Sequence, residues 1–133
     1  EKLVEMNRYL DELHSFLPST GAEYKKKIVP KRASEKTIEL AIECVYDIMA
    51  MIIAAEKFGM PSEEENFVTI LVKHTVITPK MAHVLQDMRG FRNLLVHRYA
   101  KIDDARAYRF LHENVDDFTE FERQIVVFLK RRK

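Results

Sequence analysis

The sequence contains few of the residues that interrupt helices. It has three glycines, four prolines and no tryptophan in 133 residues. Between these residues, apolar side chains recur at steps of three and four, and no stretch alternates apolar and polar residues as a half-buried strand would. The shortage of glycine and proline therefore predicts an all-α protein.

Cysteine is almost absent, because Cys44 is the single example. One cysteine cannot form an internal disulfide, which fits a reducing cytoplasm. Cys44 lies in the apolar run IECVYDIMAMIIAA. Burial there would raise the pKa of the thiol and make it unreactive, so we expect a structural role rather than a catalytic one.

Long hydrophobic runs are also missing. The longest, Ile48 to Ala55, has eight residues, whereas a membrane-spanning helix needs about 20. The first ten residues, EKLVEMNRYL, are charged and do not resemble a signal peptide. We therefore expect a cytoplasmic protein with no membrane association.

The chain carries little excess charge of either sign. It has 22 basic and 21 acidic residues, for a net charge of +1, so total charge neither favours nor excludes a nucleic-acid partner. An apolar fraction of 47% and a charged fraction of 32% are typical of a globular chain. With no linker or repeat in view, residues 1–133 are expected to form one domain.

The apolar spacing predicts a bundle of four main helices and shorter pieces. The first should stop at Pro18, and a long, very apolar helix should begin near Ser34, after a break before Pro30, and end at Gly59. The other expected elements are a short segment at 22–29, a short helix capped by Ser62 and Glu65, a helix capped by Thr78 with Pro79 in its first turn, and one last helix from about 103 to the C-terminus.

The long helix should occupy a central place. Its apolar residues cover nearly the whole circumference at IMAMIIAA, which indicates either burial on all sides or a second face covered by another subunit. The residues expected in its buried stripe are Ile38, Ala41, Ile42, Val45, Ile48, Met49, Ile52 and Ile53.

An unusual group of polar residues, RNLLVHRY, runs from Arg92 to Tyr99. Residues advance about 100° each around a helix, so Asn93 and His97 share a face, whereas Arg92 and His97 diverge by about 140°. Two routes could bring the arginine and the histidine together. The long arginine could swing, or two copies of the helix could meet across a two-fold axis.

Local charge around this group favours an anionic ligand. Between Lys80 and Lys101 there are five basic residues and one acidic residue, a balance of +4 (5 − 1). An arginine fork suits phosphate, and a histidine can move protons near neutral pH. Without a nearby carboxylate cluster, the group suits metal-independent RNA cleavage by an adjacent 2′-hydroxyl. The alternative is that Arg92 is a solvated charge and His97 a helix-end residue.

The sequence contains no motif for a cofactor, a metal ion or a nucleophilic residue. No glycine-rich phosphate loop, zinc-ligand spacing or nucleophile elbow occurs, so we expect no cofactor and no metal. His83 and Asp87 are four residues apart on the same predicted helix. A surface hydrogen bond between them is more plausible than a metal site.

The segment MRGFRNLLVHRYAKID resembles the signature of HEPN-domain proteins, and in particular of HepT-like toxins that pair with small MNT-type nucleotidyltransferase antitoxins. The signature is an arginine, a polar residue, three more residues, a histidine and, two residues on, a tyrosine. This chain has Arg92, Asn93, His97 and Tyr99 in that order. YLDEL and RASEKTIELAIECVYDIMAMII also resemble the first two helices of that family.

The resemblance implies an up-and-down helical bundle that forms a homodimer, with an active cleft between the two motif helices. It implies metal-independent endoribonuclease activity on tRNA or mRNA, with Arg92 stabilising phosphate, His97 as acid and base, and Asn93 positioning them. Tyr99 would accept AMP from the antitoxin, which would silence the cleft. The residues expected to contact RNA phosphates are Arg89, Arg98 and Lys101.

Two positions depart from the family pattern. Arg98 stands where an acidic residue is common, and Lys36 follows Glu35 where many members have arginine. Lysine cannot reproduce a bidentate arginine contact. A second interpretation therefore stays open, in which the chain is a non-catalytic HEPN module that binds a nucleotidyltransferase partner and a nucleotide or phosphate.

Overall fold

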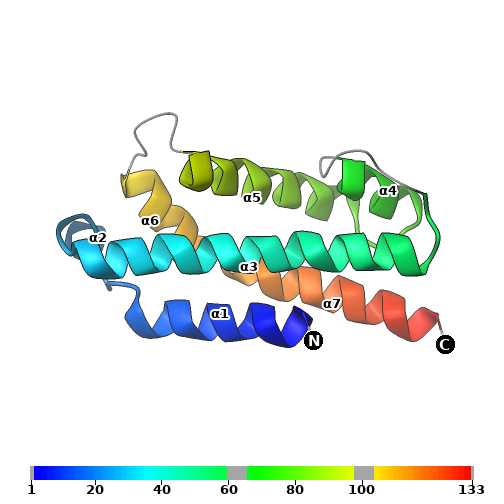
Figure 1. Ribbon diagram of the computed structural model, residues 1–133, viewed down its shortest axis with the longest axis horizontal. Helices are drawn as coiled ribbons and strands as arrows, with labels where there is room; N and C mark the ends of the chain where they lie inside the picture. The colour runs from blue at the N-terminus through cyan, green and yellow to red at the C-terminus, as the bar shows by residue number, and fades with distance from the viewer. Residues whose placement is uncertain (1, 60–65, 98–103, 133) are drawn as a thin grey trace.

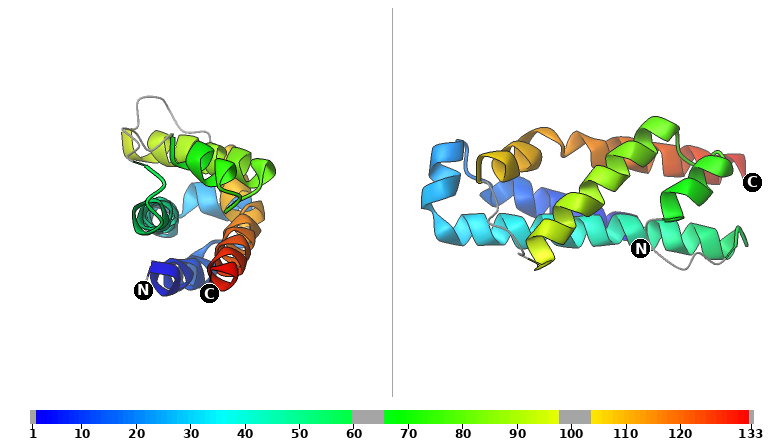
Figure 2. Two further views of the ribbon diagram at one scale, coloured as in Figure 1. Left: turned by 90° about the vertical axis from the view of Figure 1, so that its right-hand side faces the viewer. Right: turned by 90° about the horizontal axis from the view of Figure 1, so that it is seen from above.

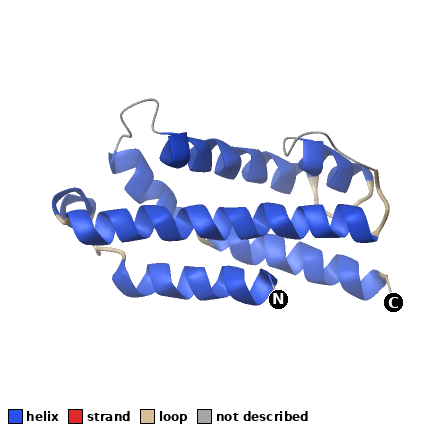
Figure 3. Ribbon diagram, viewed as in Figure 1, coloured by secondary structure: helices blue, strands red, loops and turns tan. Residues whose placement is uncertain are grey.

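The computed structural model describes residues 2–59, 66–97 and 104–132, and within these ranges it contains seven α-helices and no strand (Figures 1 and 3). The predicted all-α class is confirmed. The helices are α1 (Lys2–Phe16), α2 (Gly21–Lys26), α3 (Ile28–Ala55), α4 (Phe67–Lys73), α5 (Pro79–His97), α6 (Asp104–Glu113) and α7 (Asp116–Arg131). The expected cap formed by Ser62 and Glu65 lies outside the described residues.

The long helix α3 is the spine of the molecule. Figure 1 shows α1 running antiparallel to it on one side and α5 on the other, while α6 and α7 return along the bundle. Seen from above in Figure 2, α5 crosses the bundle obliquely, so that its C-terminal end lies over α3. The main helices alternate in direction, which confirms the up-and-down order.

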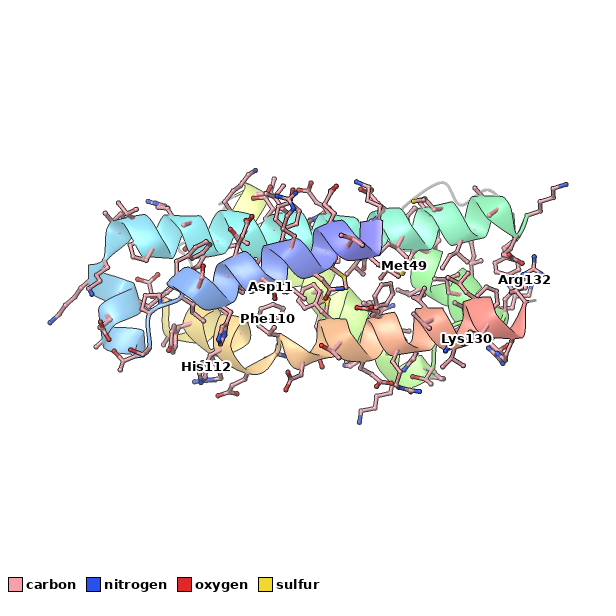
Figure 4. The ribbon with its side chains drawn as sticks, turned by 90° about the horizontal axis from the view of Figure 1, so that it is seen from below. Asp11, Met49, Phe110, His112, Lys130 and Arg132 are labelled. Carbon is pink, nitrogen blue, oxygen red and sulfur yellow. The ribbon has the colours of Figure 1, made fainter. Side chains whose placement is uncertain are left out.

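The apolar stripe predicted for α3 is buried in full. Ile38, Ala41, Ile42 and Met49 have no exposed surface, and Met49 points into the space between α3 and α7 in Figure 4. Burying side chains of this size contributes about 1.5–3 kcal/mol each. Met51, by contrast, is 57% exposed, so the apolar surface of α3 continues beyond the core of the single chain.

The start of α3 differs from the prediction. The helix begins at Ile28 and includes Pro30 as its third residue, so the expected break before Pro30 and start near Ser34 were wrong. The first N–H groups of a helix have no acceptor within it, so proline costs little in the first turn. The first hydrogen bond runs from Lys31 N to Lys27 O, at 3.1 Å, one residue after the proline. Pro30, which was interpreted as a helix break, therefore lies at the start of a helix.

The predicted last helix is two helices, α6 and α7. Asn114 and Val115 separate them, and Asn114 Nδ2 donates to Asp117 Oδ2 at 3.4 Å. Asparagine competes for local hydrogen bonds in this way and disfavours a helix interior. The bend lets Phe110, which is only half-buried, stack on Phe91 of α5 with ring centroids 4.2 Å apart.

The far end of α3 also stops earlier than expected. Its last residue is Ala55 rather than a residue next to Gly59, and Lys57 adopts a φ of 57°. Arg132, which directly follows α7, forms an ion pair with Glu56, with Nε and Oε1 2.5 Å apart. Figure 4 labels Arg132 at this end of the bundle. This ion pair ties the ends of α3 and α7 together.

The N-terminal half of α5 is fixed by three hydrogen bonds. Met81 N donates to Thr78 Oγ1 at 3.1 Å, which confirms the predicted cap. Thr78 N donates to Gln124 Oε1 of α7 at 3.0 Å, and the buried Tyr46 of α3 donates to Leu85 O at 3.0 Å. The helix that carries the RNLLVHRY group therefore has a defined position against both α3 and α7.

Candidate active site on helix α5

Three of the predicted site residues lie together on α5. Arg89, Arg92 and Asn93 are all half-buried, and Arg92 Nη2 donates to Asn93 Oδ1 at 3.3 Å. The Nε atoms of both arginines are fully buried, so their stems pack against the protein. Asn93 therefore holds one side of the Arg92 guanidinium in the folded chain.

The predicted residues occupy one arc of the helix. Measured from Arg92, Val96 stands about 40° away, Arg89 about 60°, Asn93 about 100° and position 97 about 140°. For His97 the structure describes only its place at the end of α5. In one chain, positions 92 and 97 therefore lie at opposite ends of this arc.

The positive charge of Arg92 acts on one carboxyl of α3, because it lowers the pKa of Glu43. Glu39 stands one helical turn before Glu43 on the same helix and interacts with it. Glu39 and Glu43 are far from the motif in the sequence, so local sequence did not indicate them. The signal that could have found them is their four-residue spacing on a helix whose other faces are apolar.

The surroundings of Glu43 alter its protonation. Burial raises the pKa of the Glu43 carboxyl, and the hydrogen bond to Glu39 and the charge of Glu39 raise it further. The positive charges of Arg92 and Lys36 oppose this rise.

Glu35 and Lys36 make separate contacts, and only Lys36 departs from the family pattern. Lys36 Nζ lies 3.2 Å from Glu39 Oε2 and its side chain is exposed. Glu35 is 2% exposed, accepts a hydrogen bond from Tyr24 Oη at 3.3 Å and pairs with Arg32. Lys36 therefore pairs with Glu39 on the surface of α3, whereas Glu35 holds α2 against α3.

The remaining predicted residues, Arg98, Tyr99 and Lys101, lie outside the described part of the chain. The next described residue, Asp104 at the start of α6, pairs with Lys31 of α3 at 2.7 Å, and both side chains are largely buried. The segment that holds Tyr99 therefore leads into a helix whose start is fixed on α3.

Two other predictions concern Cys44 of α3 and the pair His83 and Asp87 of α5. Cys44 is buried, and desolvation raises the pKa of its thiol to about 11, in agreement with a structural role. His83 and Asp87 are both exposed and 3.9 Å apart, a weak surface pair. Within the described ranges, no three histidine, cysteine or acidic residues gather as metal ligands, and no helix is long and apolar enough to cross a membrane.

The bundle and the arginine–asparagine pair on α5 together define a helical protein with a basic motif on its third long helix, suited to binding phosphate. Residues 6–125 match the family described as Ribonuclease HepT-like. The chain belongs to this family, and the predicted HepT-like resemblance is confirmed.

Individual relatives agree with the family assignment. The chain is 26% identical over 128 residues to the tRNA nuclease HepT of Aphanizomenon flos-aquae, which covers 96% of this chain and 87% of the relative. It is 23% identical over 101 residues to the mRNA nuclease HepT of Shewanella oneidensis, 76% of each chain. Among solved structures, the tri-AMPylated HEPN toxin of Shewanella oneidensis in complex with an MNT antitoxin matches with a TM-score of 0.88 at 21% identity, over 95% of this chain and 94% of that one. The last match establishes the HEPN fold.

Proposed function

We propose that this protein is a metal-independent endoribonuclease of the toxin type, with its site in a cleft between two copies of α5. The observation that carries the proposal is the match to the HepT-like ribonucleases over residues 6–125, with Arg92 and Asn93 hydrogen-bonded on the helix that bears the motif. The substrate is tRNA or mRNA, as in the two nuclease relatives, and the protein acts in the cytoplasm.

The chemistry needs one proton carrier and one cation. His97 takes the proton of a 2′-hydroxyl, whose oxygen attacks the adjacent phosphorus. The bond to the 5′-oxygen breaks as the protonated His97 gives its proton to that oxygen. Products are a 2′,3′-cyclic phosphate and a free 5′-hydroxyl. Arg92 stabilises the negative charge that builds on the phosphate oxygens, and Asn93 holds Arg92. Arg89, Arg98 and Lys101 bind neighbouring phosphates.

A homodimer would resolve the divergence of Arg92 and His97. Each cleft would use Arg92 of one copy and His97 of the other. Exposed apolar side chains support such an interface: Leu94 and Val96 of α5 are 48% and 47% exposed, and Met51 on the neighbouring α3 is 57% exposed. Apolar groups on adjacent helices are typical of surfaces that a second subunit covers.

We further propose that an MNT-type nucleotidyltransferase silences the toxin by transferring AMP to Tyr99. Two findings support this regulation. Tyr99 follows His97 by two residues, as in the family signature, and the Shewanella oneidensis neighbour was solved as an AMPylated toxin with its MNT antitoxin. An AMP group would place a bulky anion beside a cleft that must bind RNA phosphate.

RNA cleavage in EDTA tests the nuclease proposal. Total tRNA and a synthetic mRNA would be incubated with the wild type, with His97→Ala, and with His83→Ala as an exposed histidine control on the same helix. Intact mass would first establish that Tyr99 is unmodified. Cleavage by the wild type and His83→Ala, but not by His97→Ala, is expected. No cleavage of either RNA by the unmodified wild type would overturn the nuclease proposal in favour of a binding module.

A further inference from the structure

The corner between α2 and α3 carries positive charge that the chemistry described so far does not use. Residues 24–34 contain no acidic residue and five basic ones, which we call the basic corner: Lys25, Lys26, Lys27, Lys31 and Arg32. The whole chain has a net charge of +1, so the rest of it sums to −4 (1 − 5). All members of the basic corner except Lys31 are exposed. The charge is therefore concentrated here and open to solvent.

Nearby acids neutralise only part of the basic corner. Three members have acidic partners at 2.7–3.6 Å: Lys27 with Glu23, Lys31 with Asp104, and Arg32 with Glu35. Among the described residues, Lys25 and Lys26 form neither an ion pair nor a side-chain hydrogen bond. These two lysines therefore contribute a charge of +2 that nothing in the described chain uses.

The other basic end of the molecule differs in this respect. Arg131 donates to Thr75 O at 2.9 Å, and Arg132 pairs with Glu56. These two arginines hold the end of α7 against the segments beside it. The two unpaired lysines of the basic corner have no such structural role, so a ligand is the better explanation for them.

The basic corner lies at the motif end of the bundle. Figure 1 shows the start of α3 at the same end as the C-terminal end of α5 and the start of α6. Two contacts fix the corner there. Lys31 pairs with Asp104, the first residue of α6, and the rings of Tyr24 in α2 and Tyr108 in α6 have centroids 5.4 Å apart. An RNA bound at the motif can therefore extend toward the corner.

Helix geometry gives the separation between the corner and the motif. Tyr46 of α3 donates to Leu85 O of α5 at 3.0 Å, which joins the two antiparallel helices at known positions. Ile28 lies about 27 Å from Tyr46 along α3, and Arg92 lies about 10 Å from Leu85 along α5. Since α5 crosses obliquely, at least about 17 Å of the bundle separates Arg92 from Ile28. A stacked strand needs about five nucleotides to span this length.

We propose that the basic corner is a second RNA-binding surface, where Lys25 and Lys26 contact substrate phosphates several nucleotides away from the phosphate held by Arg92. Lysine is suited to this role, because its charge sits on a flexible stem and binds phosphate without a fixed geometry. Lysine is also depleted in interfaces between proteins, so the pair favours RNA over a protein partner. This inference rests on the proposed ribonuclease function.

The salt dependence of RNA binding tests the proposal. Each lysine–phosphate contact adds about 0.7 to the slope of log Kd against log salt for a single strand. For an uncleavable 2′-O-methyl RNA of about 20 nucleotides, Lys25→Gln/Lys26→Gln should lower this slope by about 1.4 and weaken Kd about tenfold near 0.1 M salt. The melting temperature should stay the same, because both side chains are exposed. An unchanged slope would overturn the proposal.

Two further variants separate position from total charge. Lys73→Gln/Lys130→Gln removes the same charge from exposed positions on α4 and α7, at the end of the bundle where Figure 4 labels Lys130. It should keep the wild-type slope, and so should Lys25→Arg/Lys26→Arg, which retains both charges. Equal losses of slope in the two glutamine variants would show a general charge effect and contradict a site at the corner.

Cleavage kinetics give a second readout. Lys25→Gln/Lys26→Gln should raise KM for tRNA about tenfold and leave kcat unchanged, because the corner binds substrate away from the reacting phosphate. An RNA of about four nucleotides that is cleaved occupies the cleft and is too short to reach the corner, so its kcat/KM should match that of the wild type. Equal losses of kcat/KM on both RNAs would place the two lysines at the cleft and overturn a separate surface.

The same variants distinguish RNA from a protein partner. A protein would also use the apolar pair Ile28 and Val29, which are 54% and 75% exposed. If Lys25→Gln/Lys26→Gln keeps the wild-type salt slope but binds an MNT-type nucleotidyltransferase more weakly, the corner belongs to a protein and the inference is wrong. If the wild type cleaves no RNA, the ribonuclease proposal fails, and the salt slope still decides whether the corner binds RNA.

Discussion

At the scale of single residues, the charge of Arg92 on α5 acts on a carboxyl of α3. The sequence predicted Arg92 and Asn93 correctly as neighbours on one helix, and their hydrogen bond is seen. It did not predict Glu43, because residues 43 and 92 are far apart in the chain and only the crossing of α5 over α3 brings them together. Local spacing predicts contacts within a helix and says little about contacts between helices.

The raised pKa of Glu43 makes a prediction about stability. Below its ordinary pKa the carboxyl is protonated in the folded and the unfolded chain, so burial costs nothing extra. As the pH rises through the folded-state pKa, the buried group must ionise and stability is lost. Glu43→Gln lacks this loss. Its melting temperature should match the wild type near about pH 4 and exceed it increasingly toward about pH 8, whereas a constant difference across the range would contradict the account.

The planar guanidinium of Arg92 leads to a second prediction, about catalysis. Lysine at position 92 would keep the charge but could not contact two phosphate oxygens in the plane of a guanidinium, nor donate to Asn93 in the same geometry. Arg92→Lys should therefore lower kcat for RNA by about 100-fold with little change in melting temperature. Single-turnover cleavage at saturating protein measures this directly. Wild-type kcat in the lysine variant would show that charge alone is enough.

At the scale of elements, helix starts were easier to predict than helix breaks. The cap of α5 was predicted from Thr78 and Pro79 and is seen. Pro30 was interpreted as a break, yet it lies in the first turn of α3, since a proline is compatible with both roles. The break at Asn114 gave no strong signal, because the flanking aromatic residues keep helical spacing across it.

The bond between Gln124 and Thr78 joins α7 to the start of the motif helix, which gives a prediction about α5. Gln124 is 9% exposed, accepts from Thr78 N at 3.0 Å and donates to Glu120. Gln124→Leu would leave the Thr78 N–H without its acceptor, at a cost of about 1–3 kcal/mol. Chemical denaturation should show this loss, and Thr119→Leu on the exposed side of α7 is the control. Equal stability of the two variants would contradict a role for this bond.

At the scale of the whole molecule, the fold class and helix order could be predicted, because apolar residues at helical spacing mark the buried face of each helix. The buried stripe of α3 was predicted residue by residue. The assembly could not be predicted in this way. Exposed apolar residues on α3 and α5 are consistent with a second subunit, but a sequence pattern does not specify which copies of a helix meet.

The proposed interface gives a prediction about oligomeric state. Leu94 is 48% exposed on α5, about 100° around the helix from Asn93, so in the proposed interface an aspartate there would introduce a charge and leave the core of the single chain intact. Leu94→Asp should sediment as a monomer, retain its helical circular dichroism and lose at least about 100-fold in RNA cleavage. Val127→Asp, at an exposed position on α7, is the matched control. A monomeric variant with full activity would contradict the shared cleft.

The measurement that tests the central claim most directly is RNA cleavage by mixed dimers of Arg92→Ala and His97→Ala. Each variant alone should be inactive. After unfolding, mixing and refolding, about half of the dimers contain one copy of each, and one of their two clefts is intact, so about a quarter of wild-type activity should return. Recovery at that level would establish that Arg92 of one copy works with His97 of the other. No recovery, with mixed dimers shown by native mass, would contradict a cleft shared between the two copies.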